Sequence, residues 1–168
     1  TEELLEFCDL LKFRKRTVRK LSGGMKRKLM VCRALLTDPE ILLLDEPTAG
    51  MDALSRRQMW NLLRKLNEKN LTILLTTHYM EEAQSLCNRV ALMDHGKLEE
   101  VSTPSALIES LGAYAVDEMT ADGTQNHYFH TRQEAIRYLA ELTGQASLRE
   151  TTLEDVFVER AGKHLISK

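Results

Sequence analysis

The sequence predicts an α/β fold, in which a parallel sheet with flanking helices is followed by a smaller unit of strands and helices. The segments 41–45 and 71–76 are short apolar runs without alternation, as is typical of parallel strands buried on both faces. Helical periodicity precedes the first run and separates it from the second. Shorter strand-like and helical segments fill residues 113–168. We therefore expect one domain over residues 1–112 and a small extension over residues 113–168.

Composition sets broad limits on the class of protein. With 168 residues, 43% of them hydrophobic, the chain suffices for one globular domain and a small appendage. A net charge of −2 gives no overall sign of nucleic-acid binding, and the sequence has neither a membrane-length apolar run nor a signal-peptide pattern. The cysteines, at 8, 32 and 87, lie in apolar periodic segments and predict buried, reduced thiols of a cytosolic protein. Because Thr1 already lies inside a helical pattern, we expect a piece of a longer protein.

A basic stretch follows the first predicted helix, which covers residues 2–11. Between Lys12 and Lys28 the chain has nine lysines and arginines and no acidic residue. One interpretation is a solvated face. The other is a field that attracts a polyphosphate, a phospholipid surface or a nucleic acid. The composition leaves both open.

The segment Ser22-Gly23-Gly24 begins the next predicted helix, whose buried stripe we expect at Leu29, Cys32 and Leu36. Serine is a favourable N-cap, and the glycines let a ligand approach the backbone closely. A helix N-terminus with unpaired N–H groups and nearby cations can bind an anion. The alternative is an ordinary turn before a helix.

Two carboxylates, Asp45 and Glu46, follow directly after the first apolar run. Ligand crevices of α/β proteins lie at the carboxyl ends of such strands. Asp45 would hold Mg²⁺, directly or through a water, and Glu46 would orient or deprotonate an attacking water. The alternative is a strand that ends in a solvated acidic turn.

Two further polar residues follow the same logic. Asp52 precedes a helical pattern that begins the next segment, so it suits a helix N-cap. His78 follows the second apolar run and would lie beside Glu46 if the two strands are neighbours. An imidazole at that position can hydrogen-bond a γ-phosphate.

The rest of the chain divides into short elements. We expect a helix over 80–87, a strand over 89–94, a turn at His95-Gly96, a strand over 97–101 and a helix from Pro104 to Gly112. The extension should form two strands, a helix, a strand and a helix, in the order ββαβα, folded against one another. The last helix should turn Leu153, Val156 and Phe157 inward. We expect His127 and His130 to be exposed strand residues and not metal ligands.

The order of these motifs resembles the ATP-binding subunit of ABC transporters over residues 1 to about 111. Ser22, Gly23 and Gly24 match the signature motif, and the strand 41–45 matches the Walker B strand that ends in Asp45. Glu46 matches the catalytic glutamate, Asp52 the D-loop aspartate and His78 the switch histidine. The resemblance implies a P-loop NTPase-like core. The phosphate-binding Gly-x-x-x-x-Gly-Lys-Ser/Thr loop is absent from the sequence, as are the glutamine loop and the adenine-stacking aromatic, so the resemblance covers the second half of that core.

The extension and its Thr-Leu-Glu-Asp-Val-Phe segment resemble the tail of ABC-2 type exporter ATPases, of which the daunorubicin-resistance transporter is a familiar member. The resemblance implies an ATP- and Mg²⁺-dependent ATP hydrolase, on the cytoplasmic face of the membrane, that powers export through a transmembrane permease. Two such subunits would enclose two ATP molecules, each between the phosphate loop of one subunit and the signature motif of the other. The transported substrate is not encoded in this segment.

Two other functions stay open at this point. A soluble ABC-superfamily ATPase acting on nucleic acid or the ribosome would suit the basic stretch, although the extension argues against it. A non-catalytic interaction fragment would also fit, because without a phosphate loop the chain alone should not hydrolyse ATP. We further expect the isolated chain to self-associate or to be marginally stable, through the apolar edge at residues 41–44.

Overall fold

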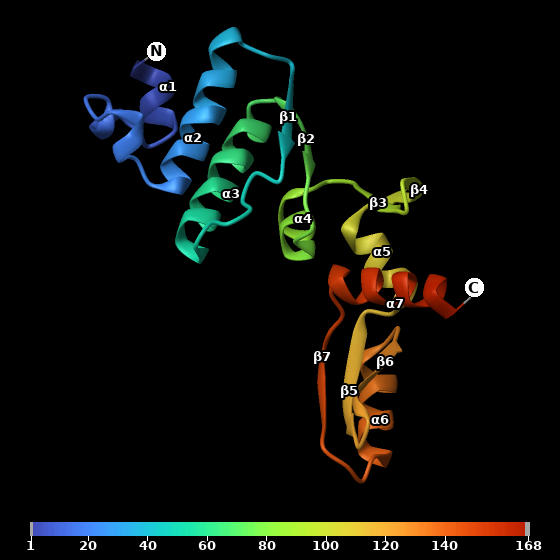
Figure 1. Cartoon of the computed structure of the whole chain (residues 1–168). Coiled ribbons are helices and arrows are strands. Elements are labelled where there is room, and N and C mark those ends of the chain that lie inside the picture. The colour runs from blue at the N-terminus through green and yellow to red at the C-terminus, as the bar shows by residue number, and fades with distance from the viewer. Residues whose placement is uncertain (1, 167–168) are drawn as a thin grey trace. The chain divides into compact units, whose positions relative to one another are not determined.

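The computed structural model describes residues 2–166, apart from the side chains of residue 94 and residues 161–166 (Figure 1). It is a mixed α/β structure with two compact units, residues 1–78 and residues 79–168. Residue 1, which is expected to lie within a helical pattern, is outside the described residues. The predicted division at residue 112 rests on motif content and stays a prediction.

The first unit contains short helices, two longer helices and two strands. In chain order these are α1 (Glu2–Phe7), the 3₁₀ turns η1 (Leu11–Phe13) and η2 (Val18–Lys20), α2 (Gly23–Ala34), η3 (Leu35–Thr37), β1 (Ile41–Asp45), α3 (Ala53–Glu68) and β2 (Thr72–Thr76). Strands β1 and β2 pair in parallel, with Asp45 opposite Thr76. Parallel neighbours need a crossover, and α3 supplies it. The predicted strands and their adjacency are confirmed.

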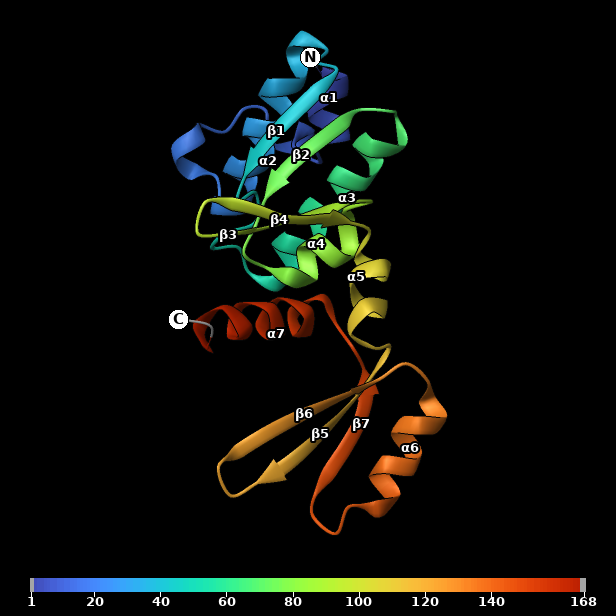
Figure 2. The same cartoon turned by 90° about the vertical axis from the view of Figure 1, so that its right-hand side faces the viewer.

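The prediction that these strands are buried on both faces is wrong for the described structure. Leu42 is 5% exposed, whereas Ile41 and Leu43 are 59% and 69% exposed. On β2, Leu74 is likewise 64% exposed. Helices α2 and α3 both lie on one face of the sheet, and no described element of this unit covers the other face (Figure 2). The apolar runs therefore have partners on one side only.

Helix α3 contributes more buried residues to this unit than any other described element, as its periodicity predicts. Its buried residues are Met59, Trp60, Leu62, Leu63 and Leu66. Helix α2 differs from expectation, because it ends at Ala34 and η3 leaves Leu36 53% exposed. Its buried side chains include Lys28, whose Nζ donates to Oε1 of Gln58 over 3.1 Å. That lysine is thus part of the helix packing and not of a solvated basic face.

The cysteine prediction is confirmed for two of the three thiols. Cys8 and Cys32 are buried and free. Burial is the main cause that raises the pKa of the Cys8 thiol to about 12, and the nearby Cys32 is the second. Cys87 is free and half-buried. Helix α1 is shorter than predicted, since it ends at Phe7 and Asp9 has a left-handed φ of +57°.

The second unit contains nine elements in the described residues. They are α4 (Met80–Leu86), β3 (Val90–Asp94), β4 (Lys97–Ser102), α5 (Pro104–Leu111), β5 (Tyr114–Thr120), β6 (Gly123–Phe129), α6 (Arg132–Glu141), β7 (Ala146–Glu150) and α7 (Leu153–Ile166). Strands β3 and β4 form an antiparallel hairpin, and β6, β5 and β7 form an antiparallel sheet in that order. The predicted ββαβα order is confirmed. Gly112 ends α5 at φ +131°, where a Cβ would lie 2.8 Å from the backbone nitrogen of Phe129.

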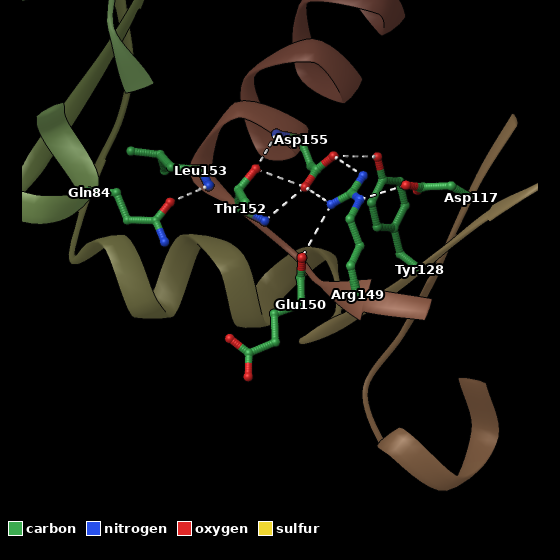
Figure 3. Close-up of polar contacts among 8 residues, drawn as sticks. All are labelled: Gln84, Asp117, Tyr128, Arg149, Glu150, Thr152, Leu153 and Asp155. Atoms are coloured by element: carbon green, nitrogen blue, oxygen red, sulfur yellow. Dashed lines mark hydrogen bonds and ion pairs between the residues drawn. The ribbon is translucent and has the colours of Figure 1, made fainter. Parts of the chain in front are cut away.

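Helix α7 departs from the expectation that residues 113–168 fold against one another. It packs on α4 and α5, and the shared core holds Ala83, Val90, Leu92, Leu107, Leu153 and Val156. The backbone N–H of Leu153 also donates to Oε1 of Gln84 over 2.9 Å (Figure 3). Leu153 and Val156 point inward as predicted, whereas Phe157 is 38% exposed. The last helix therefore ties the extension to the elements that precede it.

The junction between β7 and α7 explains the Thr-Leu-Glu-Asp-Val-Phe segment physically (Figure 3). Thr152 and Asp155 cap the helix reciprocally: the Thr152 N–H donates to Oδ2 of Asp155 over 2.7 Å, and the Asp155 N–H donates back to the Thr152 hydroxyl over 3.4 Å. Arg149 donates to both carboxylate oxygens of Asp155, over 2.7 and 2.8 Å, and to Asp117 over 2.7 Å. One carboxylate thus fixes both the start of α7 and its attachment to the sheet.

The prediction that His127 is exposed is wrong. Its Nε2 lies 3.1 Å from Oε2 of Glu118 and 3.1 Å from the Tyr138 hydroxyl, because α6 packs against β5 and β6. His130 is exposed, as predicted, but it follows β6 and is not a strand residue. Among the described residues there is no group of three His, Cys, Asp or Glu side chains that could hold a metal ion. No helix in residues 2–166 is long and apolar enough to cross a bilayer.

Candidate functional site

The first group of candidate residues lies where β1 and β2 end. Because the strands pair in register, the residues that follow them are brought together. Nδ1 of His78 lies 2.8 Å from Oε1 of Glu46. The other carboxylate oxygen of Glu46, Oε2, is buried and has no hydrogen-bond partner among the described residues. The predicted proximity of Glu46 and His78 is therefore confirmed. Oε2 of Glu46 remains to accept a proton or to bind a ligand.

Asp45 is held by the neighbouring strand. The Thr76 hydroxyl donates to Oδ1 of Asp45 over 2.5 Å, and the Glu46 N–H donates to the Thr76 carbonyl over 3.1 Å. The Asp45 carboxylate and the Glu46 backbone are thus both fixed to β2. The polar side-chain atoms of Asp45, Glu46 and Thr76 are all oxygens, the ligand type that Mg²⁺ prefers.

The backbone at Glu46 is strained. Its φ is +47°, a left-handed conformation that typically costs about 1–3 kcal/mol for a residue other than glycine. Arg27 of α2 holds this turn: Nη1 donates to the Glu46 carbonyl over 2.9 Å and Nη2 to the Ala49 carbonyl over 3.4 Å. The Ala49 N–H also donates to the Glu46 carbonyl, over 3.2 Å. Arg27 therefore links the helix that follows Ser22 to the turn that carries Glu46.

This role of Arg27 was not predicted from the sequence, where the residue is one of nine cations in a basic stretch. A signal was present. Arg27 and Lys28 lie in the first turns of α2 beside Val31, on its buried side, where a solvated cation is not expected.

The second group lies at the start of α2. The Ser22 hydroxyl accepts from the Met25 N–H over 3.2 Å, so the predicted N-cap is confirmed. A Cβ at Gly23 would meet nothing within 4 Å, whereas a Cβ at Gly24 would lie 3.0 Å from both Cβ and Oγ of Ser55. The backbone is open at the first glycine and closely packed at the second.

Asp52 caps α3, as predicted, through Ser55. The Ser55 N–H donates to Oδ1 over 2.9 Å and the Ser55 hydroxyl to Oδ2 over 2.7 Å. These hydrogen bonds from the Ser55 hydroxyl and backbone lower the pKa of Asp52. Ser55, which the sequence analysis did not single out, therefore contacts Asp52 and would contact any side chain at position 24. It joins the two segments that contain Gly24 and Asp52.

The geometry brings the candidates together in two sets. Asp45, Glu46 and His78 form one set, in which Asp45 offers carboxylate oxygens of the kind that Mg²⁺ prefers and Glu46 offers a carboxylate that can accept a proton. The starts of α2 and α3 form the other set, with Ser22, Gly23, Gly24 and Asp52. Helix N–H groups at the start of α2 suit an anion.

Comparison with known proteins gives the class. The protein-family profile described as "ABC transporter" matches residues 1–49. The chain is 38% identical to Nod factor export ATP-binding protein I of Burkholderia lata, over 96% of this chain and 60% of that protein. It is 37% identical to the protein of the same name from Cupriavidus metallidurans, over 97% of this chain and 61% of that protein. The chain thus spans about three fifths of the length of these relatives.

Solved structures give the same answer. The ADP conformation of an ATP-binding cassette of an ABC transporter matches with a TM-score of 0.60 and 26% identity, over 65% of this chain and 43% of that one. The structure of cbiO1 from Clostridium perfringens, part of the ABC transporter complex cbiONQ, matches with a TM-score of 0.60 and 25% identity, over 63% and 43%.

The fold and these comparisons define the class as an ATP-binding cassette, of the P-loop NTPase fold. More particularly, the chain is similar to the ATP-binding family of ABC transporters, with export ATP-binding proteins among its relatives. Members of this family bind nucleotide. The comparisons give no support to the alternative of an ATPase that acts on nucleic acid or the ribosome.

Proposed function

We propose that the chain forms the part of an ATP-hydrolysing export subunit that carries the catalytic glutamate. The observation that carries this proposal is the 2.8 Å contact between Glu46 and His78 at the ends of two parallel strands, with Asp45 beside it. Glu46 accepts the proton of the attacking water, and its buried, unpaired Oε2 is the atom assigned to that step. In its doubly protonated form, His78 would donate from Nδ1 to Glu46 and from Nε2 to the γ-phosphate of ATP.

The residues fit the cofactors that the proposal needs. Asp45 would hold Mg²⁺, directly or through a water, in keeping with the carboxylate and hydroxyl oxygens of Asp45, Glu46 and Thr76. When bound, Mg²⁺ would neutralise negative charge that develops on the phosphoryl group transferred from ATP. The role of this chain is to fix the carboxylates, which the Thr76 hydroxyl and the Arg27 guanidinium do from two sides.

The second set of residues serves a nucleotide bound by a partner subunit. Ser22, Gly23 and Gly24 offer helix N–H groups, and no neighbouring atom would approach a Cβ at Gly23. Asp52 lies next to this set through Ser55. Hydrolysis then depends on two subunits closing on each other, because each site needs residues from both.

The transport assignment extends from the relatives. The name of these relatives describes export. By likeness, we assign this chain to a subunit that acts with a transmembrane permease of the ABC-2 type, at the cytoplasmic face of the membrane. Residues 1–112 form its partial nucleotide-binding domain and residues 113–168 an accessory extension. The transported substrate is left unassigned, because the permease normally selects it.

The proposal is tested on an ATP-binding subunit that includes this chain together with a phosphate-binding loop. His78→Ala should lower the ATP turnover of the assembled dimer by about 10²–10³, the typical effect of losing one group that stabilises transition-state charge. His130→Ala is the matched control, because this exposed histidine lies in the extension, directly after β6. Equal turnover in the two variants would contradict the role given to His78.

A further inference from the structure

A second feature of the first unit is the segment between α1 and α2, here called the cationic loop and defined as residues 12–20. Its six basic residues, Lys12, Arg14, Lys15, Arg16, Arg19 and Lys20, are all exposed, and it has no acidic residue. The whole chain has 23 basic and 25 acidic residues, so the remainder bears 17 basic against 25 acidic ones. Positive charge is therefore concentrated on one segment of an otherwise acidic chain.

The cationic loop has a defined conformation. Leu10 and Leu21 flank it and are only 3% and 9% exposed, so both of its ends are anchored in the core. Between them, backbone N–H groups donate across two short turns, from Arg16 to Phe13 over 2.8 Å and from Lys20 to Thr17 over 2.9 Å. Figure 1 draws the loop on the far side of α2 from β1. Because the loop is already ordered, binding to a surface should cost little conformational entropy.

Half of these charges have no partner among the described residues. Arg14 pairs with Glu2 over 3.3 Å, and both side chains are largely exposed. Lys12 and Arg16 lie over the ring of Phe13, at 5.3 and 4.9 Å. The other three, Lys15, Arg19 and Lys20, have no ion-pair partner among residues 2–166. None of the six contacts the candidate site described above.

The loop also presents an apolar side chain. Val18 is 55% exposed and lies between Arg16 and Arg19 in sequence. Clusters of four to eight cations are typical of segments that bind anionic lipid headgroups, and an aliphatic side chain among them can enter the headgroup boundary. Binding to single-stranded nucleic acid instead requires exposed aromatic rings for stacking. The one aromatic here, Phe13, is half-buried and already engaged by two cations.

We propose that the cationic loop binds the anionic phospholipid surface of a membrane. The six cations attract the headgroups and Val18 inserts at their boundary. This inference rests on the proposed function only for the location of the protein beside a membrane, because the binding itself requires neither nucleotide nor permease.

The test uses the chain and two kinds of vesicle, one of phosphatidylcholine alone and one that also contains phosphatidylglycerol. Co-sedimentation should be found with the anionic vesicles only, and it should weaken as salt shortens the Debye length from about 10 Å at 0.1 M to about 3 Å at 1 M. The triple variant Lys15→Gln, Arg19→Gln, Lys20→Gln should bind on the order of a hundredfold more weakly, since each cation near such a surface contributes about fivefold. Circular dichroism of the variant checks that it is folded.

A matched control removes the same charge elsewhere. Lys65, Lys97 and Arg132 are exposed and lie outside the loop, and their joint replacement by glutamine should leave vesicle binding within about twofold. Equal losses in the two triple variants would overturn the inference, as would equal binding to neutral vesicles. Retained vesicle binding in the loop variant, with loss of binding to an RNA or a DNA duplex, would also overturn it. ATP turnover is not part of this test, so its failure and that of the proposed function are separable.

Discussion

Nη1 of Arg27 donates to the carbonyl oxygen of Glu46 over 2.9 Å, so a side chain from α2 holds the backbone of the residue assigned to the catalytic step. Glu46 has a left-handed φ of +47°, which is unfavourable for a residue with a Cβ. The second guanidinium contact, to the Ala49 carbonyl over 3.4 Å, fixes the other end of the same turn. The position of the Glu46 carboxylate therefore depends on α2.

Arg27→Ala should lower kcat by about 10–10² with a smaller change in KM, because a displacement of about 1 Å in a reacting group can cost as much as 10² in rate. The measurement is steady-state ATP turnover of a subunit that includes this chain and a phosphate-binding loop. Arg33→Ala is the matched control, since Arg33 is an exposed arginine of the same helix. A kcat that is unchanged in Arg27→Ala would show that the turn keeps its geometry without the guanidinium.

The two glycines at the start of α2 should respond differently to alanine. At Gly24 a Cβ would lie 3.0 Å from Cβ and Oγ of Ser55, so Gly24→Ala should lower the free energy of unfolding by about 1–3 kcal/mol. At Gly23 there is open space, and alanine should be neutral or stabilise the helix by up to about 1 kcal/mol. Urea unfolding followed by circular dichroism measures both. The reverse order of stability would contradict the packing at Ser55.

The second unit should become less stable in acid because of Asp155. Burial works to raise the pKa of this carboxyl, but hydrogen bonds from Arg149 and Thr152 outweigh it and hold the pKa below its usual range. A folded-state pKa below the unfolded one gives stability that is present above the unfolded value, about 3.9, and is lost as pH falls through the folded value. The free energy of unfolding should therefore fall as the pH is lowered below about 4.

Asp155→Asn should remove most of this pH dependence. It should also lower the free energy of unfolding at neutral pH by roughly 3 kcal/mol, the low end of the range for breaking a buried ion pair. The low end applies because about a third of the Arg149 side chain is exposed to solvent. Asp122→Asn, in an exposed turn, is the control. Urea unfolding at several pH values makes the comparison. A variant with the same acid sensitivity as the unaltered chain would show that other carboxylates cause it.

The strands and the pairing of Glu46 with His78 could be predicted from the sequence, because two apolar runs separated by a helix imply adjacent parallel strands whose ends meet. The contacts of Arg27 could not, since a cation that binds backbone carbonyls has the same sequence pattern as a solvated one. The exposure of Leu43 was not predicted. An apolar run indicates that both faces of a strand can be buried, but it does not show whether the described chain contains the elements that pack on them. His127 was missed because its partners, Glu118 and Tyr138, come from other elements.

The uncovered face of the β1–β2 sheet should make the isolated chain self-associate, since Ile41, Leu43 and Leu74 are each more than half exposed. Leu43→Lys should shift the chain toward the monomer in sedimentation velocity. Leu98→Lys is the matched control, because Leu98 is an equally prominent leucine on β4. If the unaltered chain is already monomeric, or if both variants dissociate it equally, the association does not use this face.

The most direct test of the account is Glu46→Gln in an ATP-binding subunit that includes this chain and a phosphate-binding loop. The amide keeps the shape of the side chain but cannot accept a proton, so ATP hydrolysis should fall by about 10²–10⁴ while ATP binding stays intact. Binding and single-turnover hydrolysis should be measured on the same preparation, with Glu68→Gln, an exposed residue at the end of α3, as the control. Retained ATP binding with hydrolysis nearly stopped is the predicted result; near-normal hydrolysis in Glu46→Gln would contradict the assignment of Glu46 as the catalytic base.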